Sequence, residues 1–469
     1  VYGNITGLKK SQLYSLEKIY RKKISPDKLI TNELARYITK LSFEIGKQLG
    51  IIISRDGNIT HVIVGDANSV FIPDLNEYSL GRNPLRGLRF IHTHLKDEPL
   101  NKEDITDLAL LRFDMIAAIS VKEGLPHNIY TAHLMPYGSE KKYEILNSNF
   151  FKYDIDFRSF VNSLEGEMQR QRTFDQRDMR ERAILISVST KPKYEMEDSI
   201  EELKELALSS DVIVLDTVIQ RLKEINPKYL LGEGKLKDLI INAMDKGATL
   251  LIFDQDLTPS QMRSIAETTE LKVIDRTQLI LDIFAKRAHS RDGKVQVELA
   301  QLRYTLPRLT GKGTAMSRLM GGIGGRGPGE MKLEIDRRRI RDRIARLERE
   351  LENLSKARIQ RKHRRTEKDI PIVSIIGYTN AGKSTLLNTL TKSSTIVEQK
   401  MFATLDTASR RLRFPREREV IITDTVGFIR DLPKDLIAAF KSTLEELEDA
   451  DLLLHVVDIS NQRFEQHIV

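Results

Sequence analysis

The sequence predicts a multidomain α/β protein, and three observations carry the prediction. Its 469 residues are too many for a single hydrophobic core. Between residues 183 and 275, short apolar runs typical of buried strands alternate with helical patterns, which predicts a small parallel sheet. Near the carboxyl end, an apolar run, a glycine-containing loop and a helical pattern follow one another, as in a doubly wound nucleotide-binding domain. The expected parts are 1–150, 151–182, 183–290, 291–368 and 369–469.

The positive charge of the chain is concentrated in one segment. The formal net charge is +8, and residues 337–368 alone hold 14 Lys and Arg against 5 Asp and Glu, a net of +9. A polyanion is therefore the expected partner of that segment. The chain has no cysteine, which excludes disulfides and thiolate metal sites. No apolar stretch reaches about 18 residues and no signal peptide is evident, so we expect no membrane span. The expected location is the cytoplasm, with peripheral membrane association as the alternative, and the expected state is a monomer.

Residues 1–150 predict an α/β extension with a group of metal-ligating side chains. Its expected elements are a helix over 32–48 and strands over 50–53, 61–64 and 88–91. His92 and His94 follow the last strand, and Asp104 lies in the first turn of the next expected helix. Two histidines at positions i and i+2 of a strand face the same way. With Asp104 they could therefore form a three-ligand zinc site with one open position.

This arrangement distantly resembles the JAMM/JAB metalloprotease fold, in which His-x-His and a later Asp hold zinc and a Glu acts as base. The sequence departs from that pattern in several places. No Pro follows His94, Asn101 stands where a Ser is usual, and the loop to Asp104 is one residue short. Glu44 is the candidate base. We therefore expect a degenerate form of the fold that serves as a docking module, with a zinc peptidase as the alternative, followed by a helical linker over 151–182.

Residues 183–290 predict the small parallel α/β domain. Its expected strands cover 184–188, 211–215, 249–253 and 271–274, and its expected helices cover 199–208, 235–245 and 259–268. A glycine-rich turn places Lys235 at a helix start, where a phosphate or RNA backbone could bind. The glycine pattern alone is weak, so a plain tight loop is the favoured interpretation.

Residues 291–368 predict an antiparallel helical hairpin. Two sets of apolar residues step by 4 and 3, which gives each helix a narrow seam: Val295, Leu299, Leu302, Leu306 and Leu309, and then Ile340, Ile344, Leu347, Leu351 and Leu354. Pro307 should kink or end the first helix. The long glycine-rich segment 311–330 lies between the two helices and predicts a tip that moulds to RNA backbone, with a disordered linker as the alternative. The arginine-rich outer face of the hairpin could also be only a solvated helix surface. The expected RNA contacts are Lys312, Arg318, Arg326, Arg337 and Arg338.

Residues 369–469 predict a P-loop domain. An apolar strand over 372–376 leads into Gly377-Tyr-Thr-Asn-Ala-Gly-Lys-Ser-Thr385 and then a helix. Backbone N–H groups of such a loop point at phosphate oxygens, Lys383 would reach the β- and γ-phosphates, and Ser384 would bind Mg²⁺. A second strand ends in Asp424-Thr-Val-Gly427, which offers a carboxylate to the magnesium shell. The expected nucleotide-binding residues are Gly377, Tyr378, Thr379, Asn380, Ala381, Gly382, Lys383, Ser384, Thr385, Asp424, Thr425, Val426 and Gly427.

Further motifs make the resemblance to a known family specific. The chain resembles the translation-factor class of GTPases, and Phe402-Ala-Thr-Leu-Asp-Thr407 with Asp424-Thr-Val-Gly-Phe-Ile429 resembles the HflX family of ribosome-associated GTPases. Segments 232–236, 274–279 and 321–338 are similar to the same family, so the resemblance covers roughly residues 183–469. It implies GTP and Mg²⁺ as cofactors, and the large (50S) ribosomal subunit and its rRNA as partners. It also implies the separation or rescue of stalled ribosomes.

The resemblance assigns roles within the site. Thr404 is the switch I threonine and a magnesium ligand beside Ser384 and Asp424, and Lys383, Thr404 and Gly427 are the catalytic residues. Phe428 stands where Ras-like enzymes have a water-orienting Gln, so we expect slow intrinsic hydrolysis that a large partner accelerates.

The guanine-reading motif Asn-Lys-x-Asp does not occur between Asp424 and Val469, where a nucleotide-binding domain of this kind would carry it. Guanine specificity therefore rests on the resemblance, and we expect the sequence to be truncated inside this domain, because the cut would expose strand and helix faces. The alternative function is an ATP-driven enzyme that remodels RNA, and a zinc peptidase with a regulatory P-loop is a more distant one.

Overall fold

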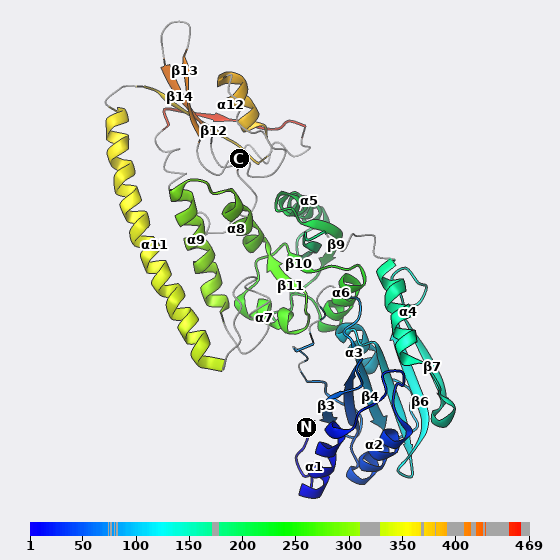
Figure 1. Ribbon diagram of the computed structural model, residues 1–469. Helices are drawn as coiled ribbons and strands as arrows, with labels where there is room; N and C mark the ends of the chain where they lie inside the picture. Colours follow the sequence, from blue (N-terminus) through cyan, green and yellow to red (C-terminus); the bar gives the residue numbers. More distant parts are fainter. Residues whose placement is uncertain are drawn as a thin grey trace. The chain divides into compact units, whose positions relative to one another are not determined.

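The computed structural model describes residues 1–73, 75, 77–78, 80, 83–170, 178–309, 329–366, 370–379, 381–391, 408–413, 419–424, 427 and 450–460. Packing divides the chain into two units (Figure 1). The first unit comprises Val1–Met179 with Glu233–Gly247, and the second comprises Arg180–Gly232 with Ala248–Val469. The five-part division expected from the sequence is finer than these two units and stays a prediction.

A mixed seven-stranded sheet forms the centre of the first unit, in the order β1-β3-β2-β4-β5-β6-β7. Pairs β1/β3 and β4/β5 are parallel, and the other pairs are antiparallel. The strands are β1 Tyr2–Gly3, β2 Leu49–Ser54, β3 Ile59–Val64, β4 Leu88–His94, β5 Met115–Lys122, β6 Leu125–Leu134 and β7 Tyr143–Asn149. The three strands expected in this region are present, and β4 extends far enough to include both histidines of the His-x-His pattern.

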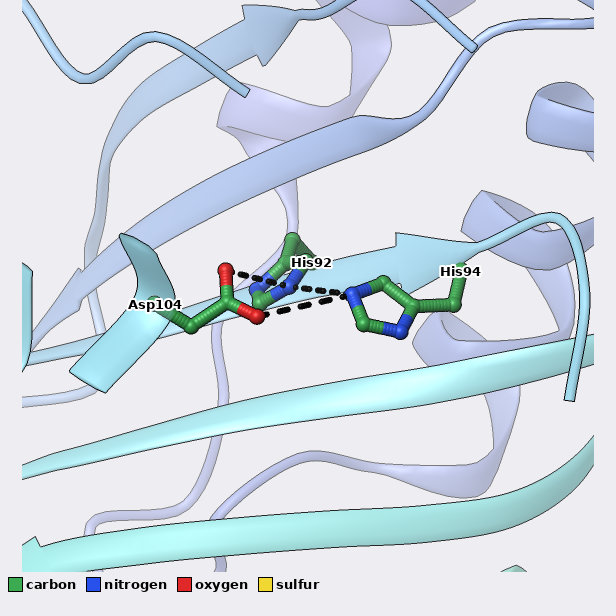
Figure 2. A group of neighbouring side chains, drawn as sticks. All are labelled: His92, His94 and Asp104. Atoms are coloured by element: carbon green, nitrogen blue, oxygen red, sulfur yellow. Dashed lines mark hydrogen bonds and ion pairs between the residues drawn. The ribbon is translucent and has the colours of Figure 1, made fainter. Parts of the chain in front are cut away.

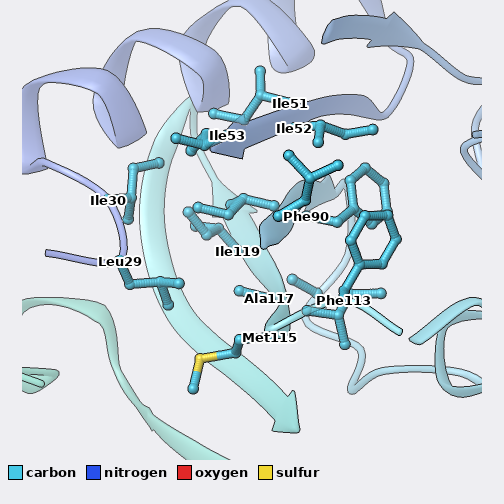
Figure 3. Close-up of a cluster of buried hydrophobic side chains, with 14 of the residues drawn as sticks. Leu29, Ile30, Ile51, Ile52, Ile53, Phe90, Phe113, Met115, Ala117 and Ile119 are labelled. Carbon is cyan, nitrogen blue, oxygen red and sulfur yellow. The ribbon is translucent and has the colours of Figure 1, made fainter. Parts of the chain in front are cut away.

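The core of the first unit lies on both faces of this sheet, so consecutive residues of a strand are all buried. Ile51, Ile52 and Ile53 of β2 are each fully buried, as a strand covered on two faces requires. Figure 3 shows this cluster, with Phe90 and Phe113 stacked at a ring-centroid separation of 5.7 Å. The helical elements of the unit are α1 Lys10–Glu17, η1 Lys18–Arg21, α2 Asn32–Ile45, α3 Lys102–Leu111, η2 Phe150–Lys152, α4 Phe157–Arg170 and α6 Glu233–Asp245.

A capping side chain and a glycine set the two ends of α2. Thr31 caps α2 by accepting a hydrogen bond from the Leu34 N–H, and Gly46 ends the helix in the left-handed region at φ 70°. The helix expected in 151–182 is α4, and its apolar face is buried in the core of the first unit. It therefore packs as part of that unit over the residues that the structure describes.

Helix α6 also belongs to the first unit, although its neighbours in sequence belong to the second. The Arg112 guanidinium, at the end of α3, donates to Asp245 Oδ1 at 2.7 Å. Both side chains of this ion pair are well shielded, which makes it stronger than an exposed pair. The sequence pattern places the helix correctly but gives no sign of this packing partner.

The second unit contains a parallel sheet in the order β11-β10-β8-β9, as the alternation of strands and helices predicts. The strands are β8 Arg182–Ser189, β9 Ile213–Arg221, β10 Leu250–Phe253 and β11 Lys272–Asp275. The helices with them are α5 Lys193–Ser209, α7 Pro259–Glu267 and α8 Arg276–Arg287. Capping explains the start of α7, because Thr258 and Gln261 form a reciprocal capping box in front of Pro259.

The segment 274–279 anchors several elements through two buried ions. Asp275 caps α8 by accepting from the Gln278 N–H at 3.0 Å, and it also accepts from the Tyr304 hydroxyl. Arg276 pairs with Asp254 at 2.8 Å and with Glu202 at 2.9 Å. Because Arg276 has two carboxylate partners and Asp275 accepts hydrogen bonds, the network offsets its own desolvation and fixes α8 against the sheet.

The helical hairpin is formed by α9 Arg291–Thr305, the short turn η3 Leu306–Arg308 and α11 Gly329–Thr366. Helix α9 ends at Thr305 and Pro307 lies in η3, so the predicted interruption is confirmed. The seam packs as expected, with Val295, Leu299 and Leu347 at its buried centre. A bidentate ion pair between Arg343 and Glu298 borders it at 2.7 and 2.8 Å.

One expectation about the hairpin was incomplete. Helix α9 is not confined to a narrow seam, because Val297, Ala300 and Tyr304 on another face are buried in the core of the parallel α/β sheet. The reason is geometric: a helix of about four turns has room for two apolar stripes, and the 4-3 spacing revealed only one of them.

A second four-stranded sheet, in the order β13-β14-β12-β15, carries the glycine-containing loop. Its elements are β12 Ile372–Ile376, α12 Lys383–Thr391, β13 Ala408–Arg413, β14 Glu419–Asp424 and β15 Leu452–His455. Strand β12 is parallel to β14 and β15, whereas β13 is an antiparallel edge that the sequence pattern did not predict. The multidomain α/β class is confirmed. Within the described ranges, none of the helices combines the length and apolar character needed to cross a bilayer.

Candidate functional site

The loop between β12 and α12 has the backbone geometry of a phosphate-binding loop. Gly377 has φ +147° and a side chain there would meet the Val456 carbonyl oxygen at 2.3 Å, so only glycine fits. Gly382, just before α12, has φ +89°. Helix α12 then begins at Lys383 with the Leu386 N–H bonded to the Gly382 carbonyl. The N-terminus of α12 thus lies directly after the loop, where unpaired N–H groups favour an anion.

Lys383 is held inside this loop and is 7% exposed. Its Nζ donates to the Tyr378 carbonyl at 2.6 Å, which points the ammonium group back across the loop. Burial lowers the pKa of Lys383 to about 8, and the nearby Asp424 carboxylate opposes that shift. A buried ammonium group that gains an anionic partner becomes more stable, so this position suits a phosphate.

Ser384 and Asp424 meet at the end of the parallel strands. The Ser384 Oγ donates to Asp424 Oδ2 at 2.6 Å, and Asp424 is almost fully buried at the carboxyl end of β14. A hydroxyl and a carboxylate oxygen are hard ligands of the kind that Mg²⁺ prefers, so these side chains fit a magnesium ion. Gly427 lies against the same loop, because a Cβ at that position would come within 2.7 Å of Lys383 Nζ.

The structure describes many of the predicted nucleotide-binding residues, but not all of them. Gly377 through Thr379, Ala381 through Thr385, Asp424 and Gly427 are described and belong to this one site or its flanks. The remaining predicted residues of the site lie outside the described ranges: Asn380, Thr404, Thr425 and Val426. Phe428 also lies outside them.

The predicted RNA-contacting residues divide in the same way. Lys312, Arg318 and Arg326 lie outside the described residues. Arg338 is exposed on α11, and its contact with RNA stays a prediction. Arg337 is only partly exposed, and its Nε donates to the Leu309 carbonyl at 3.0 Å. Arg337 therefore helps to hold α11 beside the end of the first hairpin helix. The turn before α6 leaves Lys235 exposed at the start of that helix.

A second cluster of chemical interest lies in the first unit, where the His-x-His pattern predicts it. His92 and His94 on β4 converge with Asp104 on α3, and their ligand atoms all lie within 4.8 Å of one another (Figure 2). His92 Nε2 is 3.3 Å from Asp104 Oδ1 and 2.9 Å from His94 Nε2. Burial, with His92 next to it, lowers the pKa of His94, while His92 and the Asn101 N–H help to lower the pKa of Asp104 against the effect of burial.

Glu44 has no described contact with this cluster. Its side chain is about half exposed on α2 and lies 3.9 Å from Lys40 one turn away. Asp107, which the sequence pattern did not single out, is the carboxylate whose charge interacts with Asp104 and His92, and burial raises its pKa to about 6. An i, i+3 spacing from Asp104 on a helix was the available signal for it.

The strand, loop and helix around Lys383 define a P-loop nucleoside triphosphatase. Three family profiles match the chain: "GTP-binding GTPase N-terminal" over residues 197–285, "GTP-binding GTPase Middle Region" over 287–365 and "50S ribosome-binding GTPase" over 372–468. The chain belongs to the HflX family of GTPases, as its relatives show.

These relatives each match a little over three fifths of the chain. GTPase HflX of Caldanaerobacter subterraneus is 53% identical over 289 residues, which are 62% of this chain and 67% of that protein. GTPase HflX of Escherichia coli K12 is 45% identical over 295 residues, 63% of this chain and 69% of that protein. A crystal structure of a GTP-binding protein from Sulfolobus solfataricus in complex with GDP is 26% identical, with a TM-score of 0.35, over 61% of this chain and 74% of that one.

Proposed function

We propose that this GTPase binds the large ribosomal subunit and uses its nucleotide state to control that binding. The observation that carries the proposal is the meeting of Ser384 and Asp424 beside Lys383. Together these three residues of the chain form a site at which the family's nucleotide chemistry can take place. The profile described as a 50S ribosome-binding GTPase, which matches residues 372–468, supports the choice of partner.

The residues of the site that the structure describes receive roles from their positions, and Thr404 and Phe428 receive theirs from the sequence resemblance. Lys383 neutralises the β- and γ-phosphates, and the loop N–H groups hold their oxygens. Ser384 and Asp424 would hold a magnesium ion, with Thr404 as the third ligand that the resemblance implies, and the ion would offset the negative charge on the phosphates. The N–H of Gly427 senses the γ-phosphate, because this residue lies next to Lys383. Phe428 provides no group that orients water, so hydrolysis is slow until the ribosome is bound.

The hairpin supplies the contact to ribosomal RNA. Over the described part of α11, exposed arginines alternate with the buried seam, and they include Arg338, Arg341 and Arg346. Rows of arginine on one helix suit the phosphate backbone, and Lys312, Arg318 and Arg326 add charge at the tip. By inserting this arm, the protein would separate or rescue stalled ribosomes.

Two measurements test the proposal. Displacement of a fluorescent GDP analogue by GTP and by ATP should show a clear preference for guanine, and a preference for adenine would make this an ATP-driven enzyme that remodels RNA. Sucrose-gradient analysis of ribosomes incubated with the protein and GTP should show separated subunits. Intact ribosomes at saturating protein, with Lys383→Ala giving the same profile, would contradict the proposed activity.

A further inference from the structure

In the cluster of His92, His94 and Asp104 the hydrogen-bond acceptors outnumber the protons, and a bound cation would supply the missing positive charge. His94 Nδ1 lies 2.8 Å from the Glu98 carbonyl oxygen, which can only accept, so Nδ1 carries the proton. The Nε2 atom of the neutral His94 ring then presents a lone pair. That lone pair faces His92 Nε2 at 2.9 Å and Asp104 Oδ2 at 3.8 Å. At most one further proton, carried by His92 Nε2, is therefore left in the cluster. Both His94 Nε2 and the Asp104 carboxylate would have to accept a hydrogen bond from it.

The surroundings hold each of these side chains in place. His92 stacks on Phe90 with ring centroids 5.0 Å apart and an interplanar angle of 16°, and its strand is paired on both sides. Asp104 Oδ2 accepts from the Asn101 N–H at 2.7 Å, as part of the capping box of α3. The other oxygen, Oδ1, is the one that faces His92. Ligands oriented by outer contacts of this kind are typical of metal centres.

A purely structural role accounts poorly for the cluster. His92 and His94 are 1% and 3% exposed, so water cannot readily satisfy their ring nitrogens. Buried polar atoms normally find partners, and the polar atoms that this cluster does bring together are mostly acceptors. A divalent ion between the two Nε2 atoms and Oδ1 would remove the conflict among them.

The ligand types decide which ion fits. Two imidazoles and one carboxylate favour zinc and similar transition metals, whereas Mg²⁺ and Ca²⁺ prefer oxygen ligands only. Three protein ligands also leave one of the four tetrahedral positions free. Asp104 is the most accessible of the three, with 13% of its side chain exposed, so the free position would open on its side.

We propose that His92, His94 and Asp104 bind one divalent transition-metal ion of the zinc class, with a fourth position left for water or a small ligand. The site lies in the first unit and the P-loop lies in the second. The proposal is therefore independent of the proposed function, and each can fail without the other.

Metal analysis of the purified full chain tests this proposal. Protein prepared without a histidine tag is stripped with a chelator, loaded with zinc, desalted and measured by mass spectrometry. The expected content is about one zinc ion per chain, with a dissociation constant measured by competition with a chromogenic chelator. The chain has no cysteine and only 9 histidines, so few other strong zinc sites compete.

Two variants and a control make the result specific. His94→Gln and Asp104→Asn should each weaken zinc binding at least about 10-fold, and Asn at position 104 can still accept a hydrogen bond in the capping box. His127→Gln replaces a partly exposed histidine of the same unit outside the cluster and should bind zinc like the parent. The thermal midpoint, measured on all variants, shows whether each one is folded.

Cobalt loading gives a second readout. Co²⁺ in the parent should show the intense visible absorption of a four-coordinate site, and the two ligand variants should lack it. A folded parent protein whose affinity for zinc is no higher than that of His94→Gln would overturn the proposal. So would an equal zinc content in the parent and both ligand variants.

Discussion

The Ser384 hydroxyl donates to the Asp424 carboxylate at 2.6 Å, and so joins the first turn of α12 to the end of β14. Two segments 40 residues apart thus bring a hydroxyl and a carboxylate to one point beside the phosphate-binding loop. We expect these two side chains to share a magnesium ion when nucleotide is bound.

The first prediction follows from this pair. Ser384→Ala removes a magnesium ligand but leaves the loop backbone in place. With Mg²⁺ present, the affinity for GTP should fall at least about 10-fold. In excess chelator the parent and the variant should differ little, because no metal then contributes. Titrations in both buffers measure the difference, and an equal loss in the two would mean that Ser384 serves only the loop structure.

The second prediction concerns pH. The pKa of Lys383 in the protein without nucleotide is lowered to about 8, and phosphates bind its protonated form. Binding must therefore take up a proton above pH 8, and affinity should decline as pH rises through 8, by up to about 10-fold per pH unit. Below pH 8 this effect should vanish. Lys383→Arg is the matched control, because a guanidinium stays charged, so its affinity should be lower but flat from about pH 7 to 9.

The third prediction tests the hairpin seam. Leu347 is 1% exposed at the centre of the contact between α9 and α11. Leu347→Ala should cost about 2–4 kcal/mol and speed hydrogen exchange in both helices. Ile335→Ala, at an exposed position of α11, is the control and should have little effect. Unchanged exchange in α9 would show that its other face, buried with α8, carries its stability alone.

The fourth prediction distinguishes RNA contacts made by segment 311–330 (the tip) from RNA contacts made by helix α11 (the arm). Replacing Lys312, Arg318 and Arg326 with Ala should weaken binding to large subunits, and each lost phosphate contact should lower the slope of log affinity against log salt by about 0.7–0.9. Nucleotide affinity should not change. The matched variant replaces Arg338, Arg339 and Arg341 of α11. If only the second set weakens binding, RNA recognition belongs to the helix and the tip is a linker.

Much of the fold could be predicted because local patterns determine it. β12, α12 and β14 follow directly from apolar runs on either side of glycine, and the 4-3 spacing of leucines predicted the contact that Leu347 makes. The approach of His92, His94 and Asp104 could be predicted because two of them alternate on one strand and the third begins the next helix.

Features that depend on tertiary packing could not be predicted. Arg89, in an apolar strand, is fully buried and its guanidinium lies 4.5 Å from the ring centroid of Phe157. Burial lowers its pKa to about 10, and the nearby Asp114 carboxylate opposes the shift. Nothing in the sequence around residue 89 indicates the helix that covers it. The strand β13 was missed for a similar reason, since its pairing with β14 is long-range and its own residues are mostly polar and basic.

Acceleration of GTP hydrolysis by the ribosome at the Lys383 site is the central element of the proposed function. The most direct test is the rate of phosphate release from GTP by the protein alone and with purified large subunits, with Lys383→Ala as the blank. We predict slow turnover alone and a rise of at least about 10-fold with saturating subunits, because the partner must supply the alignment that Phe428 cannot. Equal turnover with and without subunits, at concentrations where binding is complete, would contradict it.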